Sequence, residues 1–232
     1  MREGESLGLL GANGAGKSTL LRILATLLLP TGGAARVAGF NTVGESREVR
    51  LRLGYHAGTD NGFYARLTAR QNLRFFGRLN QLSSATTRER IETLGAQFRV
   101  EESLDSQVRT LSTGTVQRLS LVRALLHQPP VILLDEPTRS LDAIAAMEFR
   151  RFLKSGILQS GQTSLLFASH TLAEIELLAD RVAIIDSGRV LACDTPSNLR
   201  RQTNTANLEE VFLRLTGFRS PDEPSVSKDP VE

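Results

Sequence analysis

The chain has 232 residues, 41% of them hydrophobic and 23% charged, which is enough for one well-cored domain with a subdomain. Its 28 Lys and Arg residues against 25 acidic ones give a net charge of +3 that never gathers into a basic run, which argues against a nucleic-acid binder. The single Cys193 excludes an internal disulfide framework, and no segment approaches the roughly 20 apolar residues of a membrane helix. We expect a cytoplasmic protein that reaches a membrane only through a partner.

Strands and helices alternate along much of the chain. The pattern predicts strands at "SLGLL", "ARVAGF", "LRLGYH", "VILLDEP", "TSLLFASH" and "VAIIDSGRV". It predicts helices after "GKS", over "LTARQNLRFFGRLNQL" and "TTRERIETLGAQFRV", from "LSTG" onward, over "AIAAMEFRRFLKSGI" and over "TLAEIELLADR". This alternation favours an α/β fold with a mainly parallel sheet covered by helices on both faces, while the middle of the chain is helical.

The loop after the first predicted strand is a phosphate-binding motif. "GANGAGKS" satisfies the pattern G-x-x-x-x-G-K-[ST] between a strand and a helix, as a P-loop requires. Glycines allow backbone N–H groups to converge on a polyphosphate, and the helix dipole adds attraction. Lys17 would bridge the β- and γ-phosphates, and Ser18 would ligate Mg²⁺. The predicted ATP-binding residues are Gly11, Ala12, Asn13, Gly14, Ala15, Gly16, Lys17, Ser18 and Thr19.

Two acidic residues end the apolar strand "VILLDEP". In P-loop enzymes an aspartate at this position holds Mg²⁺, so Asp135 is predicted to be a metal-site residue together with Ser18. Glu136 would act as the general base toward the attacking water. Taken alone, the two acids also fit a helix cap or a solvated turn, and the preceding motif decides in favour of the metal site.

A second candidate anion site opens the helix at "LSTGT". Ser112 is a plausible N-cap, Gly114 permits close backbone approach, and Leu119, Val122 and Leu126 would bury one face of the helix. In isolation this short motif is most often an ordinary capped helix. Its position just before the strand that ends in two acids favours an anion-binding site over an ordinary capped helix.

Together these stretches resemble the nucleotide-binding domain of ABC transporters, over nearly everything except the tail. "GANGAGKST" resembles Walker A, "LSTGT" the LSGGQ signature, "VILLDE" Walker B, "SLD" the D-loop, and "SH" the switch histidine, all in the family's order. The resemblance implies an ATPase that dimerises head to tail, so that each signature contacts ATP held by the other subunit. It assigns trans ATP contacts to Leu111, Ser112, Thr113, Gly114 and Thr115, cross-interface communication to Ser140, Leu141 and Asp142, and γ-phosphate and water contact to His170.

Two departures from the family pattern stand out. The coupling loop "GYHAGTDNGFYARLT" lacks the family's glutamine, and Gln71 lies too far along to replace it, which leaves His56, Thr59 or Asp60 as substitutes or as ordinary turn residues. Only ten residues precede Gly11, where the family normally has a further edge strand and an aromatic residue that stacks on adenine. A shortened start, with weaker nucleotide binding, is therefore expected.

The resemblance predicts an ABC nucleotide-binding domain over residues 1–218, with a P-loop core at 1–57 and 121–218 and a helical subdomain carrying the signature at 58–120. Residues 219–232, rich in Pro, Ser and charge, are predicted to be disordered. The leading hypothesis is the ATP-hydrolysing subunit of an exporter, peripheral on the inner face of the cell membrane through a separate permease. The alternatives are a regulatory half of a heterodimer with little turnover and a soluble ABC ATPase acting on chromosomes or ribosomes.

Overall fold

The computed structural model describes residues 1–58, 62–139 and 141–217. The predicted tail at 219–232 lies outside these ranges, as do Ser140, Thr59 and Asp60. The described strands are β1 (Ser6–Leu10), β2 (Arg36–Val37), β3 (Phe40–Asn41), β4 (Leu53–His56), β5 (Val131–Asp135), β6 (Ser164–Ala168), β7 (Arg181–Asp186) and β8 (Arg189–Asp194). The α-helices are α1 (Lys17–Leu24), α2 (Ser46–Leu51), α3 (Ala69–Leu79), α4 (Ser84–Gln97), α5 (Thr113–Leu125), α6 (Ala143–Arg151), α7 (Leu172–Leu178), α8 (Pro196–Thr203) and α9 (Leu208–Thr216).

One six-stranded sheet organises the fold in the order β4-β5-β6-β1-β7-β8. The first five of these strands are parallel to their neighbours, and β8 pairs antiparallel with β7 at the edge. The predicted α/β class, with a mainly parallel sheet flanked by helices, is confirmed. The predicted boundaries between core and helical subdomain stay a prediction.

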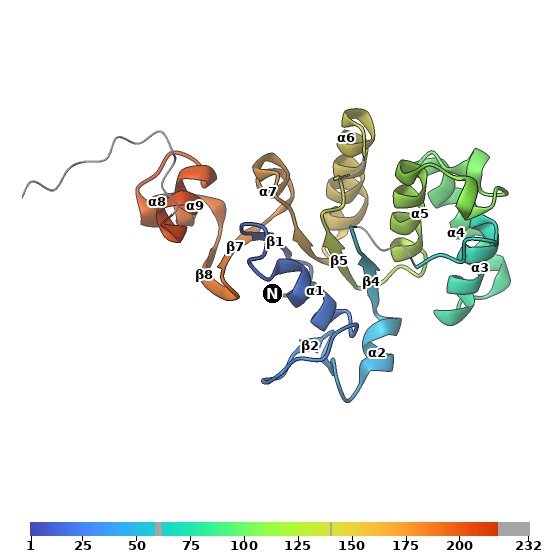
Figure 1. Ribbon diagram of the computed structural model, residues 1–232, viewed down its shortest axis with the longest axis horizontal. Coiled ribbons are helices and arrows are strands. Elements are labelled where there is room, and N and C mark those ends of the chain that lie inside the picture. Colours follow the sequence, from blue (N-terminus) through green and yellow to red (C-terminus); the bar gives the residue numbers. More distant parts are fainter. Residues whose placement is uncertain (59–61, 140, 218–232) are drawn as a thin grey trace, which may run out of the picture.

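The alternation of side chains along each strand divides the core into two layers. On β5, Val131 and Leu133 pack on one face, where α1, β2 and α2 cover the sheet. Ile132 and Leu134 pack on the other face, under α5, α6 and α7. Figure 1 shows these two groups of elements on opposite sides of the strands. All five β5 residues are buried, which explains the almost uninterrupted apolar run in the sequence.

Two predicted strands are in fact hairpins. The segment "ARVAGF" turns back at Ala38 and Gly39, whose φ angles are 48° and 85°, so that β2 pairs with β3. The segment "VAIIDSGRV" turns at Ser187 and Gly188, with φ angles of 47° and 76°, into the antiparallel β8. Two successive positive φ angles are the requirement of a tight hairpin turn, and the glycine was the signal that a continuous-strand interpretation overlooked.

The helical predictions hold in the middle of the chain and fall short elsewhere. The predicted helix over residues 143–157 is α-helical only to Arg151 and continues as a π-helix over Phe152–Ile157. The short α2 and α8 carried too few apolar repeats to be predicted. Helix α9 was overlooked, although Leu208, Val211, Phe212 and Leu215 follow helical spacing. Among the described residues, no helix is both long enough and apolar enough to cross a bilayer.

The contact between β4 and α5 is tight enough to demand glycine at position 54. A Cβ atom there would lie 2.2 Å from the carbonyl oxygen of Ala124 and 2.8 Å from Pro129 Cγ. We expect Gly54→Ala to lower the free energy of unfolding by about 1–3 kcal/mol, because the backbone must shift to admit the methyl group. Urea unfolding measures the loss. Gly32→Ala is the matched control, since nothing lies within 4 Å of that position, and equal stability of the two variants would contradict the prediction.

Candidate functional site

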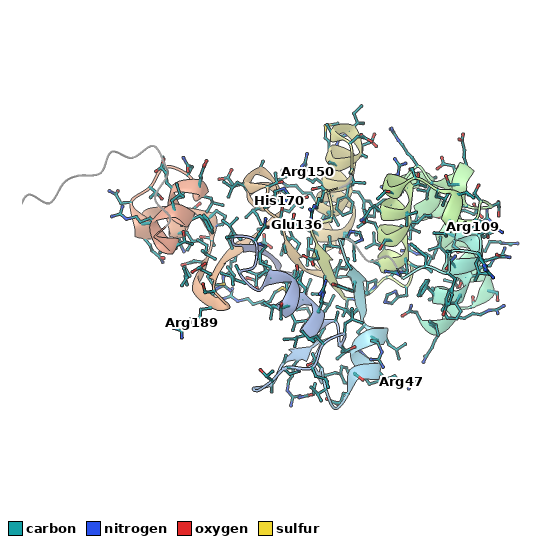
Figure 2. The ribbon with its side chains drawn as sticks, in the orientation of Figure 1. Arg47, Arg109, Glu136, Arg150, His170 and Arg189 are labelled. Carbon is teal, nitrogen blue, oxygen red and sulfur yellow. The ribbon has the colours of Figure 1, made fainter. Side chains whose placement is uncertain are left out.

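The carboxyl ends of three neighbouring strands meet at one edge of the sheet. β5, β6 and β1 are adjacent and parallel, with Leu134 beside Phe167 and Leu9 beside Ala168. Because parallel strands end on the same side, the residues that follow each strand gather there. The loop at 11–16, the acids at the end of β5 and His170 after β6 are thus brought together, and Figure 2 shows Glu136 and His170 side by side.

The loop between β1 and α1 needs glycine for two different reasons. At Gly11 a Cβ would lie 2.4 Å from the carbonyl oxygen of Ile185 on β7, so the loop leaves the sheet in close contact with its neighbour. Gly16, just before α1, has a φ of 104°, which side chains disfavour. The N–H of Gly188 in the β7–β8 turn donates to the carbonyl of Ala15 at 2.9 Å. The loop is therefore held from two sides before any ligand binds.

Lys17 lies folded into this loop. Its Nζ donates to the carbonyl oxygens of Gly11 at 2.7 Å and Ala12 at 3.1 Å, and the residue is only 7% exposed. Burial lowers the pKa of Lys17, and the nearby carboxylates of Glu136 and Asp135 oppose that effect. An ammonium group held by carbonyls alone is a good partner for an anion that enters the loop.

Ser18 connects the loop to the end of β5. Its Oγ donates to Asp135 Oδ1 at 3.0 Å, and Asp135 is buried. A hydroxyl and a carboxylate oxygen at this separation are donors that suit Mg²⁺, which typically takes one or two protein carboxylates and completes its shell with water and phosphate. No group of three or more His, Cys, Asp or Glu residues with metal-binding geometry occurs in the described part of the chain. The oxygens of Ser18 and Asp135 therefore fit a phosphate-bound magnesium rather than an all-protein metal site.

Glu136 and His170 form a direct pair. His170 Nδ1 donates to Glu136 Oε2 at 2.5 Å, and the Glu136 N–H donates to the carbonyl of Ala168 at 3.0 Å. The backbone of Glu136 has a φ of 50°, a left-handed conformation that costs a non-glycine residue about 1–3 kcal/mol and persists mostly at functional positions. This conformation turns the carboxylate away from β5 and toward the residue that follows β6.

A cavity of about 480 Å³ unites these groups. It is lined by residues 13–19 of the loop and by Glu136, Arg139 and His170. Most of the predicted residues of the phosphate and metal site line this cavity directly. The exceptions are Gly11 and Ala12 at the start of the loop and Asp135, which lies behind Ser18. Arg139 was not predicted, although a cation three residues after the acids was a visible signal.

The predicted signature lies elsewhere. Ser112 is the N-cap of α5, as predicted, and its Oγ accepts from the Thr115 N–H at 3.2 Å. Leu119, Val122 and Leu126 are fully buried under it, also as predicted. None of residues 111–115 lines the 480 Å³ cavity, and Figure 1 shows α5 standing apart from the start of α1. Asp142 caps α6 in the same way, with its Oδ1 accepting from the Ala145 N–H at 2.9 Å.

The predicted coupling loop is tied to α5 through His56, which the sequence analysis singled out, and through Gln117 and Ser120, which it did not. The Gln117 side chain donates its Nε2 to the carbonyl of Gly58, and His56 Nδ1 lies 3.1 Å from Ser120 Oγ. On the loop's other side, a Cβ at Gly58 would lie 2.7 Å from the carbonyl oxygen of Asp135. At Gly58 the loop is therefore pressed between α5 and the end of β5.

A buried carboxylate supports the His170 turn. Glu174 on α7 is fully buried, and its Oε2 accepts from Thr138 Oγ1 at 3.4 Å. Burial raises the pKa of Glu174, while the hydroxyls of Ser169 and Thr138 oppose the shift. In the sequence, only the position of Glu174 four residues after His170 indicated that it lies near the site.

Comparison with known proteins decides the family. A family model described as "ABC transporter" matches residues 1–139. The chain is 38% identical to the ABC transporter ATP-binding protein NatA of Bacillus subtilis, over 92% of this chain and 86% of that protein. The chain belongs to the ABC transporter family. It is also 40% identical to the daunorubicin resistance ATP-binding protein DrrA3 of Streptomyces coeruleorubidus, covering 90% of this chain and 65% of the relative.

Solved ABC structures have the same fold. The structure of an ATP-binding subunit of an ABC transporter superposes with a TM-score of 0.85 at 32% identity, over 92% of this chain and 88% of that one. A dimeric bacterial ABC transporter cassette gives a TM-score of 0.76 at 25% identity, over 84% of this chain and 87% of that one. The protein is thus an ABC ATPase, the ATP-binding subunit of a transporter.

The buried His56 makes stability depend on pH. Burial, together with the nearby positive charge of Arg123, lowers the pKa of His56 from 6.5 to about 3. Between about pH 3 and pH 6.5 His56 is therefore protonated in the unfolded chain but neutral in the folded one. His56 therefore contributes fully above about pH 6.5 and progressively less below it. We expect the difference in unfolding free energy between wild type and His56→Asn to be smaller at pH 5.5 than at pH 7.5 by about 1.4 kcal/mol. Urea titrations at the two pH values measure this, and a difference that does not change with pH would refute it.

Proposed function

We propose that this ABC ATPase binds ATP and Mg²⁺ in the 480 Å³ cavity, dimerises around the nucleotide and drives export through a separate membrane permease. One observation carries the proposal: Lys17, Ser18, Glu136 and His170 meet at a single cavity at the strand ends. Both curated relatives described above are ATP-binding proteins, one of a transporter and one of drug resistance. Docked on a permease, the chain would lie peripherally on the inner face of the cell membrane.

The residues of the cavity divide the chemistry among them. Phosphate oxygens of ATP would take Lys17 Nζ from the carbonyls of Gly11 and Ala12, which hold it now. Backbone N–H groups of the loop and the start of α1 would receive the remaining phosphate charge. When bound, Mg²⁺ would neutralise charge on the β- and γ-phosphates, held by Ser18 and Asp135.

Glu136 is placed to orient the attacking water. Its Oε2 accepts from His170, whereas Oε1 has no hydrogen-bond partner among the described residues and remains to accept a proton from water. His170 Nδ1–H fixes the direction of the carboxylate, and the imidazole itself borders the cavity. Water would then attack the γ-phosphorus in line as the bond to the β-phosphate oxygen breaks, yielding ADP and phosphate.

A second copy of the chain would supply the signature. In this chain residues 111–115 lie away from the cavity, so one copy holds the two halves of the site on separate surfaces. A twofold dimer places the signature of each chain over the cavity of the other, and both composite sites form at once. The Ser112 hydroxyl and the N-terminus of α5 would then contact the γ-phosphate. Loss of that phosphate removes the contacts and favours opening.

Neutralising Glu136 should separate hydrolysis from dimerisation. We expect Glu136→Gln to lower kcat for ATP hydrolysis by about 10²–10⁴-fold while ATP binding survives, since only the general base is lost. With ATP and Mg²⁺ the variant should elute as a dimer in size exclusion, whereas wild type relaxes to monomer as ATP is consumed. A strictly monomeric variant would defeat the dimer proposal. Wild-type phosphate release no faster than that of the variant would instead favour the low-turnover regulatory half.

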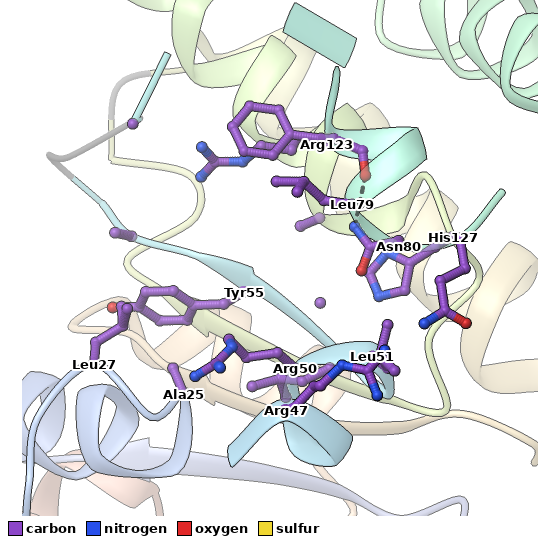
Figure 3. Close-up of a pocket in the computed structure, with 17 residues that line it drawn as sticks. Ala25, Leu27, Arg47, Arg50, Leu51, Tyr55, Leu79, Asn80, Arg123 and His127 are labelled. Atoms are coloured by element: carbon purple, nitrogen blue, oxygen red, sulfur yellow. Dashed lines mark hydrogen bonds between the residues drawn. The ribbon is translucent and has the colours of Figure 1, made fainter. Parts of the chain in front are cut away.

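A groove beside the coupling loop is the proposed docking site for the permease. A cavity of about 530 Å³ opens between α2 and β4 on one side and α3 and α5 on the other. Figure 3 shows Leu27, Leu51, Tyr55 and Leu79 around it, with Arg47 and Arg50 along one wall. Leu27 and Leu79 are 64% and 58% exposed and border the same groove, which suits the apolar face of an amphipathic helical segment of a partner. We assign the groove to a short helix of the permease whose acidic end faces the two arginines.

The groove is connected to the catalytic cavity through the coupling loop. Ala57 and Gly62 line the groove, while Gly58 between them abuts Asp135 and accepts from Gln117. A helix seated in the groove would therefore press on a segment that touches both the metal-site strand and the signature helix. This contact supplies the coupling that the family's missing glutamine would otherwise provide.

A charge placed in the groove should uncouple the ATPase from its permease. We expect Leu79→Glu to abolish copurification with the membrane permease that the proposed function assigns to this chain, because a carboxylate would be buried against apolar surface. ATP hydrolysis by the isolated chain should stay unchanged. Leu191→Glu on β8, at a residue 42% exposed and outside the groove, is the matched control. Retention of the permease by the Leu79 variant would remove the groove from the proposal.

A further inference from the structure

A second cavity, of about 410 Å³, lies where α3 and α4 pack together. It is lined by Arg74, Arg78, Ser84, Ala85, Thr87 and Arg88. No carboxylate and no aromatic residue belongs to this lining. Three guanidinium groups from two helices thus surround one hollow.

The three arginines differ from their neighbour Arg70 in their interactions. Among the described residues, Arg74, Arg78 and Arg88 make no ion pair and no side-chain hydrogen bond. Arg70, one turn before Arg74 on the same stripe of α3, instead pairs with both Glu92 and Asp105. Arg74 interacts with the exposed Asp105 through charge alone, without a hydrogen bond. Like charges at i and i+4 cost stability, so an unpaired arginine pair indicates a ligand more than a structural role.

The start of α4 adds backbone donors to the same hollow. Ser83 is the N-cap, and its Oγ accepts from the Thr86 N–H at 3.0 Å. Ser84 and Ala85 are the first two residues of this fourteen-residue helix, and their N–H groups have no partner within the helix. The positive end of the helix therefore points toward the side of the cavity that the arginines surround.

Close helix packing fixes the arrangement. A Cβ at Gly77 would lie 2.6 Å from Thr87 Cγ2, so α3 and α4 touch at backbone distance. Thr87 is buried, and its Oγ1 donates to the carbonyl of Ser83 at 2.7 Å. Arg74 and Arg78 lie on either side of Gly77 in sequence, and Arg88 follows Thr87. The contact that joins the helices thus also holds the three arginines around one space.

We propose that Arg74, Arg78 and Arg88 form a binding site for a phosphate-bearing anion, and that the ligand is the headgroup of an anionic phospholipid. Guanidinium groups match phosphate oxygens in pairs, and the volume suits a glycerophosphate group. The absence of an aromatic from the lining disfavours a nucleobase.

The assignment of the anion to a membrane lipid rests on the proposed function. Helix α3 lines both hollows, with Arg74 and Arg78 in this one and Leu79 in the 530 Å³ groove. A permease seated in that groove would bring this face of α3 near the membrane surface, where anionic lipids attract arginine. The cavity would then orient the ATPase against the bilayer beside its permease.

Vesicle binding tests the site. Sedimentation compares the full chain on vesicles of phosphatidylcholine with and without phosphatidylglycerol. We expect binding only with phosphatidylglycerol, and a loss of at least about tenfold in affinity for the triple variant Arg74→Ala, Arg78→Ala, Arg88→Ala. The triple variant Arg151→Ala, Arg189→Ala, Arg201→Ala removes the same charge from α6, β8 and α8 and should bind like wild type. Urea unfolding and ATP hydrolysis of both variants, each expected to match wild type, show that the fold is intact.

Each alternative result of these experiments contradicts a specific part of the proposal. Equal vesicle binding by the two triple variants, with permease copurification retained by both, refutes the site. Calorimetry with glycerol 3-phosphate and with inorganic phosphate tests the source, because tight binding of either without any vesicle binding would show a soluble anion. Undiminished vesicle binding together with lost permease copurification would show an acidic protein segment instead. If wild type does not bind the vesicles but Leu79→Glu still blocks copurification with the permease, only the lipid inference is refuted. If wild type itself does not copurify with the permease, the proposed function is refuted.

Discussion

The register of three parallel strands is the constraint on which the site depends. β6 lies between β5 and β1, so the loop after β1 and the acids after β5 are brought to the same edge but not into direct strand pairing. The hydrogen bond from Ser18 Oγ to Asp135 Oδ1 closes that gap. A shift of one residue in β5 would turn Asp135 to the other face of the sheet and place Glu136 out of reach of His170. The pairing of β5 with β6 therefore sets the geometry of the proposed catalytic groups.

The sequence alone supports a prediction for the parts of the proposed site that backbone chemistry dictates. A P-loop needs glycines and a lysine at fixed spacing, so Gly11, Gly16 and Lys17 could be assigned without a structure. Asp135 and Glu136 could be proposed because the P-loop motif made a metal and water site the better interpretation of a buried strand that ends in two acids. Ser112 and the buried face of α5 followed from ordinary capping and helical periodicity. These predictions rested on local rules, and the local geometry is as they required.

The parts that escaped prediction depend on contacts between distant segments. Gln117 reads as one polar residue on a helix, and only the fold shows that its amide reaches Gly58. Glu174 looks like a surface acid of an amphipathic helix, yet packing against Thr138 buries it completely. The hairpins at Ala38 and Ser187 were missed for a different reason. In both segments a single glycine weighed less than the strand-like residues on either side of it.

The coupling loop illustrates how a fold can keep a connection after losing the side chain that usually makes it. The contacts that hold this loop use backbone atoms of Gly58, whose carbonyl accepts from Gln117 and whose Cα lies against the Asp135 carbonyl. Such contacts do not depend on which side chains follow in the loop, but they do require that position 58 have no Cβ. Displacement of the loop by a partner in the groove would strain both contacts together, because a backbone segment moves as a unit. The proposed path from the groove to the 480 Å³ cavity is therefore steric, and it would need no glutamine in the loop.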